Sequence, residues 1–214
     1  MKKVYIYKAY ERFWHWSQAF LGFFLAFTGF EIHGSFVFFG YKNAVMYHNM
    51  AAISFLILIA FTIFWHFATG EWKQYIPTFT NIKAQIDYYL IGIFKKAPHP
   101  TRKTELSKLN PLQKLVYFGL KVLLIPMLSI SGLLYMFYRY ESNGQIKSLN
   151  IDGLGGIASV HTLIALLMIA FVIVHLYLIT TGTTVFSNLK AMLTGYEELE
   201  HEDEESEEKK ETNE

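Results

Sequence analysis

Histidine is the residue whose positions in this 214-residue chain most clearly predict chemistry. An ionisable side chain at membrane depth costs free energy, so it needs a pairing partner or a functional role. A single such histidine is more often a helix–helix hydrogen-bonding residue than a ligand. Six in three runs are harder to explain in that way, and imidazole is a ligand of haem iron. The six histidines that lie within long apolar runs or at their ends are His15, His33, His48, His66, His161 and His175.

The two histidines of the last apolar run, His161 and His175, are 14 residues apart. At about 100° per residue, this spacing returns to within about 40° of the same helix face. The rise between them is about 21 Å, which places one near each membrane surface. One helix would therefore offer one nitrogen ligand to each of two cofactors, and a bis-histidine haem needs a second ligand on a facing helix at each level.

The first two apolar runs supply candidates at both levels. His15 and His33 are 18 residues apart, and so are His48 and His66, so the members of each pair share a helix face. Spacing alone therefore leaves the partners of the last run open. Gly22 and Gly29 follow His15 at intervals of seven residues, which would let a porphyrin approach the backbone or let two helices pack closely.

Cysteine is absent from the sequence. Its absence excludes disulfides, iron–sulfur clusters held by this chain, zinc ribbons and the thioether attachment of c-type haem. A redox cofactor would therefore be held by histidine or methionine, or would belong to a partner.

Four apolar runs of membrane-spanning length position these histidines. A hydrocarbon core of about 30 Å needs about 20 helical residues. We therefore expect an all-α membrane protein, a bundle of four transmembrane helices, with Pro126 kinking the third. The expected spans are Phe13–Ile32, Ala44–Ala68, Leu115–Tyr138 and Leu154–Thr181.

The distribution of basic residues predicts the orientation. The N-terminus carries four of them, and the segment between the second and third spans carries eight, whereas the opposite side has Lys42, Arg139 and Lys147. The positive-inside rule then places both termini and the long segment in the cytoplasm, as in a multi-pass protein of the bacterial inner membrane. The basic character of the body thus follows from topology and does not indicate nucleic-acid binding.

Two further segments complete the predicted organisation. Between Asn81 and Lys96, apolar residues recur at helical spacing, which predicts an amphipathic helix lying in the membrane interface. Residues 1–196 form the predicted bundle domain. From Glu197 to Glu214 the chain carries 11 of its 18 acidic residues, which is typical of a disordered, cytoplasmic tail.

At these residues the sequence resembles the membrane di-haem cytochrome b subunits of respiratory complexes. That family includes the formate dehydrogenase gamma subunit and the cytochrome b subunits of Ni,Fe-hydrogenase and thiosulfate reductase. The resemblance covers nearly all of residues 5–198, and its most specific parts are the R-x-x-H-W element at Arg12 and the histidine pair of the last span. Further matching pieces are YHN at Tyr47 and KLNPLQKLVYFGLK from Lys108.

The resemblance implies two b-type haems and assigns their ligands. It pairs His15 with His175 on the cytoplasmic haem and His48 with His161 on the outer haem. His66 and His33 remain as alternative ligands, and His66 could instead contact a haem propionate or a quinone. Arg12 and Lys121 are propionate candidates, although Lys121 could instead extend to the membrane surface.

The resemblance also implies a quinone, menaquinone or ubiquinone, near the cytoplasmic haem. Asn110 and Gln113 begin the third span at that depth, and their amides could donate to a quinone carbonyl. Asn110 before Pro111 is equally typical of a helix N-cap.

We therefore expect an electron-transfer subunit that connects the quinone pool with a periplasmic or membrane-associated redox partner. The alternative functions are a stand-alone membrane reductase of an external acceptor and a haem-free transporter or structural protein.

Overall fold

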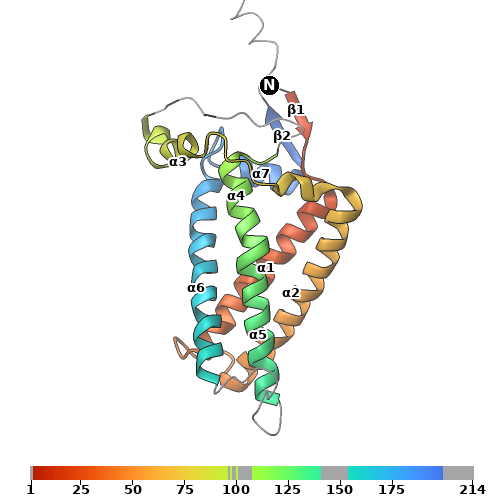
Figure 1. The fold of residues 1–214 in the computed structure, drawn as a ribbon, viewed down its shortest axis with the longest axis vertical. Coiled ribbons are helices and arrows are strands. Elements are labelled where there is room, and N and C mark those ends of the chain that lie inside the picture. Colours follow the sequence, from red (N-terminus) through yellow and green to blue (C-terminus); the bar gives the residue numbers. More distant parts are fainter. Residues whose placement is uncertain (1, 96, 98–99, 101–107, 141–153, 200–214) are drawn as a thin grey trace, which may run out of the picture.

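The computed structural model describes residues 2–95, 97, 100, 108–140 and 154–199, and it is dominated by long helices (Figure 1). The helices and strands, in chain order, are β1 (Lys2–Tyr5), α1 (Ala9–Ile32), α2 (Tyr41–Thr69), the 3-10 helix η1 (Glu71–Tyr75), α3 (Ile82–Leu90), the 3-10 helix η2 (Gly92–Lys95), α4 (Pro111–Gly119), the π-helical segment η3 (Leu120–Leu124), α5 (Ile125–Tyr140), α6 (Leu154–Ile179), α7 (Ser187–Thr194) and β2 (Tyr196–Leu199).

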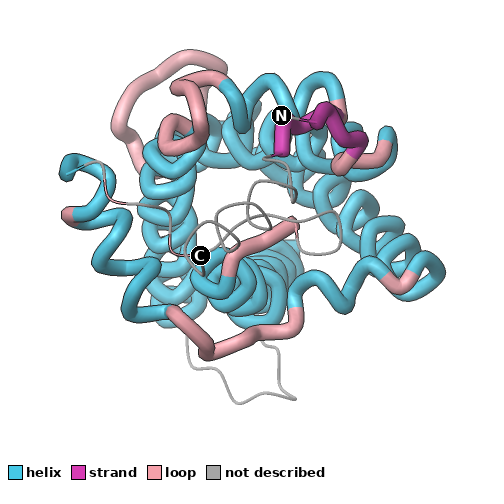
Figure 2. The backbone as a smooth tube through the Cα atoms, turned by 90° about the horizontal axis from the view of Figure 1, so that it is seen from above, coloured by secondary structure: helices cyan, strands magenta, loops and turns pink. Residues whose placement is uncertain are grey.

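The long helices run side by side as a bundle (Figures 1 and 2). α1 packs along α2, α5 packs along α6, and α2 also contacts α5. Within the described residues, α2, the helical stretch Pro111–Phe137 and α6 are long and apolar enough to cross a membrane. α1 has 24 residues, but its first half carries Trp14, His15 and Gln18, which lower its mean hydropathy.

Large apolar side chains cover the outside of the bundle. Phe20 on α1, Phe61 on α2 and Ile173 on α6 are each more than 60% exposed. In water such a surface would be costly, whereas lipid tails are as apolar as these side chains. The surface therefore agrees with a bundle that is solvated by lipid.

The turn between α1 and α2 is organised by a buried carboxylate. Glu31 Oε1 accepts hydrogen bonds from three successive backbone N–H groups, those of Phe38, Phe39 and Gly40, at 2.7–2.8 Å. The carboxylate lies at the N-terminus of α2, where the helix dipole favours negative charge. It thereby fixes the geometry of the helical hairpin.

The third long helix, formed by α4, η3 and α5, contains a π-helical segment just before Pro126. Pro126 has no N–H to bond the preceding turn, and its ring crowds the carbonyl four residues back. The helix adopts π geometry over Leu120–Leu124 immediately before this point and continues as α5. The disturbance that the sequence predicts at Pro126 therefore takes the form of a π segment, a geometry frequent at functional sites.

One end of the bundle, which we call the β end, is closed by β1, β2 and α7 (Figure 1). β1 pairs with β2 in antiparallel register, with Lys2 opposite Leu199, so both ends of the described chain lie here. Glu197–Leu199, which the sequence analysis assigned to the acidic tail, belong to β2. The rest of that predicted tail lies outside the described residues.

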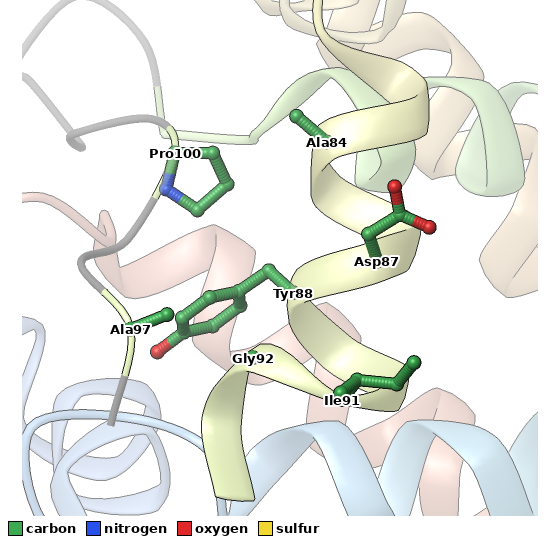
Figure 3. A pocket seen from close by; sticks show the side chains of 7 residues that line it. All are labelled: Ala84, Asp87, Tyr88, Ile91, Gly92, Ala97 and Pro100. Carbon is green, nitrogen blue, oxygen red and sulfur yellow. The ribbon is translucent and has the colours of Figure 1, made fainter. Parts of the chain in front are cut away.

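The segment between α2 and α4 is less regular than predicted. The helix expected from Asn81 to Lys96 is α3, which ends at Leu90, followed by the short η2. Gln85 is fully buried, while Ile86 and Leu90 are 39% and 68% exposed, so α3 presents apolar side chains on its exposed surface. A hollow of about 400 Å³ lies beside it (Figure 3), lined by Ala84, Asp87, Tyr88, Ile91, Gly92, Ala97 and Pro100. None of these residues is a histidine.

Candidate functional site

Two pairs of histidine rings face each other across the bundle, one pair at each level. The ring centroids of His15 on α1 and His175 on α6 are 6.2 Å apart. Those of His48 on α2 and His161 on α6 are 6.4 Å apart. Two imidazoles on opposite sides of one metal ion, each with a metal–nitrogen bond of about 2 Å, would have ring centres about 6 Å apart. The spacing of both pairs therefore fits a shared iron.

Hydrogen bonds determine the tautomer of both rings in the pair remote from the β end. Thr28 Oγ1 donates to Phe24 O at 2.8 Å and lies 2.9 Å from His48 Nδ1. Because the hydroxyl proton is used, Oγ1 accepts from Nδ1–H, and the Nε2 of His48 carries a free lone pair. Ser131 repeats the arrangement, donating to Leu128 O at 3.1 Å and lying 3.0 Å from His161 Nδ1. This is the outer-shell support that metal-binding histidines typically have.

The pair near the β end is held differently. The Tyr117 hydroxyl lies 3.4 Å from His175 Nδ1. His15 Nδ1 is buried and has no hydrogen-bond partner within the described part of the chain. The His15 ring packs edge-on against Trp16 and is held by packing.

Each pair consists of two imidazoles, and the described residues contain no group of three or more histidine, cysteine, aspartate or glutamate side chains that could hold a metal ion. A two-nitrogen donor set suits an iron whose other four ligands belong to a porphyrin. The residues present therefore fit a haem at each level.

Glycines on neighbouring helices let the imidazole rings of His48 and His161 lie close to the helix backbone. A Cβ at Gly29 would lie 3.6 Å from His48 Cε1, and one at Gly132 would lie 3.0 Å from His161 Cε1. No atom lies within 4 Å of the Cβ position at Gly22, so that face of α1 is open, as the porphyrin interpretation of this glycine requires.

The two alternative ligands lie outside the ring pairs. His33 ends α1, is exposed, and contacts Thr162 Oγ1 through Nε2 at 3.2 Å. His66 is buried, with Nδ1 2.7 Å from Thr62 O and Nε2 3.1 Å from Lys121 Nζ. Both ring nitrogens of His66 are thus in use.

Lys121, on η3, contacts side chains of α1, α2 and η1. Its Nζ lies 3.2 Å from the Tyr75 ring centroid and 4.9 Å from that of Trp14, in addition to its contact with His66. Cation–π contacts of this kind stabilise a desolvated ammonium.

Arg12 connects α1 to the β end. Its Nη1 donates to Leu193 O at 2.7 Å, and Trp16 Nε1 donates to Met192 O at 3.2 Å, so both residues satisfy carbonyls in the last turn of α7. The Nε of Arg12 is buried without a partner among the described residues. A direct contact from Arg12 to a haem propionate stays a prediction.

Asn110 and Gln113 form a capping box at the start of α4. Gln113 N donates to Asn110 Oδ1 at 2.8 Å, and Asn110 N donates to Gln113 Oε1 at 3.0 Å. Asn110 Nδ2 donates to the Tyr89 hydroxyl at 2.9 Å. The N-cap interpretation of Asn110 is thus confirmed, and a direct bond from these amides to a quinone stays a prediction.

A network of four charged side chains joins the first helix to η1 and to the start of α4. Lys108 Nζ lies 2.9 Å from Glu11 Oε1 and 3.3 Å from Glu71 Oε2, and Lys8 Nζ lies 2.7 Å from Glu71 Oε1. Burial raises the pKa of Glu71, but the bonds to Lys8 and Lys108 outweigh it and hold that pKa below its usual value.

This lowered pKa predicts a loss of stability in acid. A carboxylate with a depressed folded-state pKa contributes stability above its unfolded pKa, near 4.5, and loses it as the pH falls through the folded value. We expect the thermal unfolding temperature to fall below about pH 4.5 and Glu71→Gln to remove part of that dependence. Glu197→Gln serves as the control carboxylate. An unchanged acid profile for Glu71→Gln would contradict the network's role.

Comparison with known proteins agrees with this geometry. The model of the family described as prokaryotic cytochrome b561 matches residues 6–195. A protein of Escherichia coli (strain K12) named "Putative cytochrome YdhU" is 30% identical over 203 residues, covering 91% of this chain and 75% of the relative. No solved structure matches. The chain belongs to the prokaryotic cytochrome b561 family of membrane electron-transfer proteins that bind haem b.

The residues that orient the histidines carry no signal in the sequence. Thr28, Ser131 and Tyr117 are ordinary residues of the spans, and nothing in the pattern distinguishes Gly132 from other glycines. Their roles depend on how each helix is rotated against its neighbour, which no local pattern specifies.

Proposed function

We propose that this protein is a four-span electron-transfer subunit with two b-type haems, connecting the quinone pool with a redox partner on the outer, periplasmic face. The observation that carries the proposal is the pair of facing histidine couples, His15–His175 and His48–His161, with ring centroids 6.2 and 6.4 Å apart. α6 contributes one ring to each couple, about 21 Å apart along its axis.

The chain's own residues position and tune these sites. A haem iron between two imidazoles supplies one-electron transfer when bound. Thr28 and Ser131 hold their histidines in the tautomer that leaves Nε2 bare, and the apolar helices exclude water. Such outer contacts and burial are the means by which a protein sets a haem potential.

The fold supports a bacterial inner-membrane topology with both termini cytoplasmic. β1 and β2 pair at one end of the bundle, which supports an even number of crossings, with α1 spanning together with the three more apolar helices. Among the described basic residues, Lys8 at the start of α1 and Lys108 before α4 meet at Glu71 at this same end, in keeping with the positive-inside rule.

Several features support a quinone site at the β end. This end holds His15 and His175, the polar residues Lys121 and His66, and α3, whose exposed apolar residues suit the membrane interface. A quinone site is mostly apolar with a few placed polar groups. Asn110 and Gln113 shape this region by fixing the start of α4.

The decisive test is haem content. Purified protein is expected to contain two non-covalent b-type haems per chain, extractable by acid–organic solvent because the chain has no cysteine for thioether links. A pyridine haemochrome assay with quantitative amino-acid analysis measures this ratio. One haem per chain, or none, would falsify the two-level proposal. Co-purification in mild detergent identifies the redox partner.

A further inference from the structure

The geometry points to Lys121 as the residue that exchanges protons with the quinone, with His66 as the residue that positions it. This inference rests on the proposed quinone site at the β end and names the group that acts there. Four residues define the cluster, which we call the lysine cage: Trp14, His66, Tyr75 and Lys121.

The hydrogen bonds of the cage define the state of Lys121. His66 Nδ1 lies 2.7 Å from the carbonyl of Thr62, which only accepts, so the ring proton is on Nδ1. The bare Nε2 then accepts a hydrogen bond from Lys121 Nζ at 3.1 Å. One N–H of the ammonium is used in this way, and the other two donate no hydrogen bond within the described part of the chain.

The positive charge of Lys121 is not neutralised by an ion pair within the described part of the chain. The two nearby carboxylates, Glu11 and Glu71, are bound to Lys108 and Lys8. Four charges in that network cancel, so Lys121 is an additional, part-buried basic group that contacts two π faces and His66. Burying such a group is costly, which suggests a functional role.

The cage lies directly beside the His15–His175 pair. Trp14 precedes His15 in sequence and packs edge-on against His66 at 5.6 Å. Tyr117, four residues before Lys121, lies with its hydroxyl 3.4 Å from His175 Nδ1. A ligand that contacts Lys121 would therefore be close to the haem held by these two histidines.

A chain of charged groups near the cage reaches the surface. It runs from the half-exposed Lys8 through Glu71 and Lys108 to the buried Glu11. Burial raises the pKa of Tyr75, and the charges of Glu11, Tyr117 and Glu71 raise it further, so the network acts electrostatically on the cage.

The proton balance is simple. Conversion of a quinone to a quinol takes up two electrons, supplied by the redox partner through the cytochrome, and two protons. For each proton, an N–H bond of the Lys121 ammonium breaks and an O–H bond forms on the quinone. The amine then regains a proton from cytoplasmic water, and a second transfer completes the quinol. In quinol oxidation the same steps run backwards.

Two substitutions separate proton exchange from charge. Lys121→Met removes both, whereas Lys121→Arg keeps the charge on a group that does not release its proton. Lys114→Met is the matched control, since it removes a lysine seven residues earlier, outside the cage. The full chain with its haems, in proteoliposomes, is tested with duroquinol between pH 6 and 9. Duroquinone binding is measured separately by quenching of tryptophan fluorescence.

We expect Lys121→Met and Lys121→Arg to slow haem reduction by duroquinol about 10²-fold, the scale of general acid–base catalysis. In the wild-type protein the rate of haem reduction should rise with pH, because Lys121 must be deprotonated to accept a proton from the quinol. Lys121→Arg should lose this rise while it keeps duroquinone binding and haem content. Lys114→Met should behave as wild type. A wild-type rate in Lys121→Arg would overturn the proton role. Loss of one haem in Lys121→Met with binding retained would assign Lys121 to a propionate instead. A wild-type protein that neither binds duroquinone nor reacts with duroquinol would refute the quinone proposal itself.

Discussion

His161→Ala and His48→Ala are expected to remove the same haem, and His15→Ala and His175→Ala the other. Each substitution deletes one imidazole of a facing couple, and a b-type haem that loses an axial ligand has no covalent link to retain it. We therefore expect each variant to keep about half of the haem content. Redox titration followed in the visible spectrum measures which of two potential components disappears.

His33→Ala and His66→Ala are the matched controls. His33 contacts Thr162, and His66 contacts Thr62 and Lys121, so neither faces another histidine ring. Both variants should retain two haems. If His66→Ala removed the same component as His175→Ala, the pairing of His15 with His175 would be wrong.

Much of the bundle follows from local sequence because helix formation and membrane burial are local properties. A run of about 20 apolar residues forms a helix in lipid whatever surrounds it. The boundaries of the predicted runs Ala44–Ala68 and Leu154–Thr181 accordingly agree within a few residues with those of α2 and α6. The 14-residue spacing of His161 and His175 likewise depends only on the pitch of one helix.

The partners of these two rings could not be derived in the same way. His15 and His33 share a face of α1, and His48 and His66 share a face of α2, so periodicity leaves the choice open. Which ring meets α6 depends on the tilt and rotation of three helices together. The resemblance to a family supplied the pairing that the structure also has, and its role in ligation is what the histidine variants test.

The β end shows a second limit. The antiparallel pairing of β1 with β2 joins residues almost 200 positions apart, and the donation from Arg12 to Leu193 spans a similar distance. The R-x-x-H-W element indicates that Arg12 is functional. It does not predict that one N–H group of Arg12 donates a hydrogen bond to the last turn of α7. The cage around Lys121 depends on η3, and a π segment changes which face of the helix a residue occupies.

Gly132→Val is expected to remove the His48–His161 haem and leave the other in place. Even a methyl group at Gly132 would lie 3.0 Å from His161 Cε1, closer than nearly all real contacts, and valine adds two more carbons. His161 would be pushed off its bond with Ser131, and its ring would be displaced from its position opposite the His48 ring. The histidine itself remains, so the loss would show that ring position, and not ring identity alone, decides haem binding.

Gly29→Ala is the control for this substitution. Its added Cβ would lie 3.6 Å from His48 Cε1, an ordinary van der Waals contact, so the haem should be retained with at most a small shift in potential. Gly132→Ala should fall between the two, with a larger shift or partial haem loss. The two components of a redox titration, together with haem content, measure all three variants. Full retention of both haems in Gly132→Val would mean that His161 is not held where the iron must be, and would contradict the outer haem site.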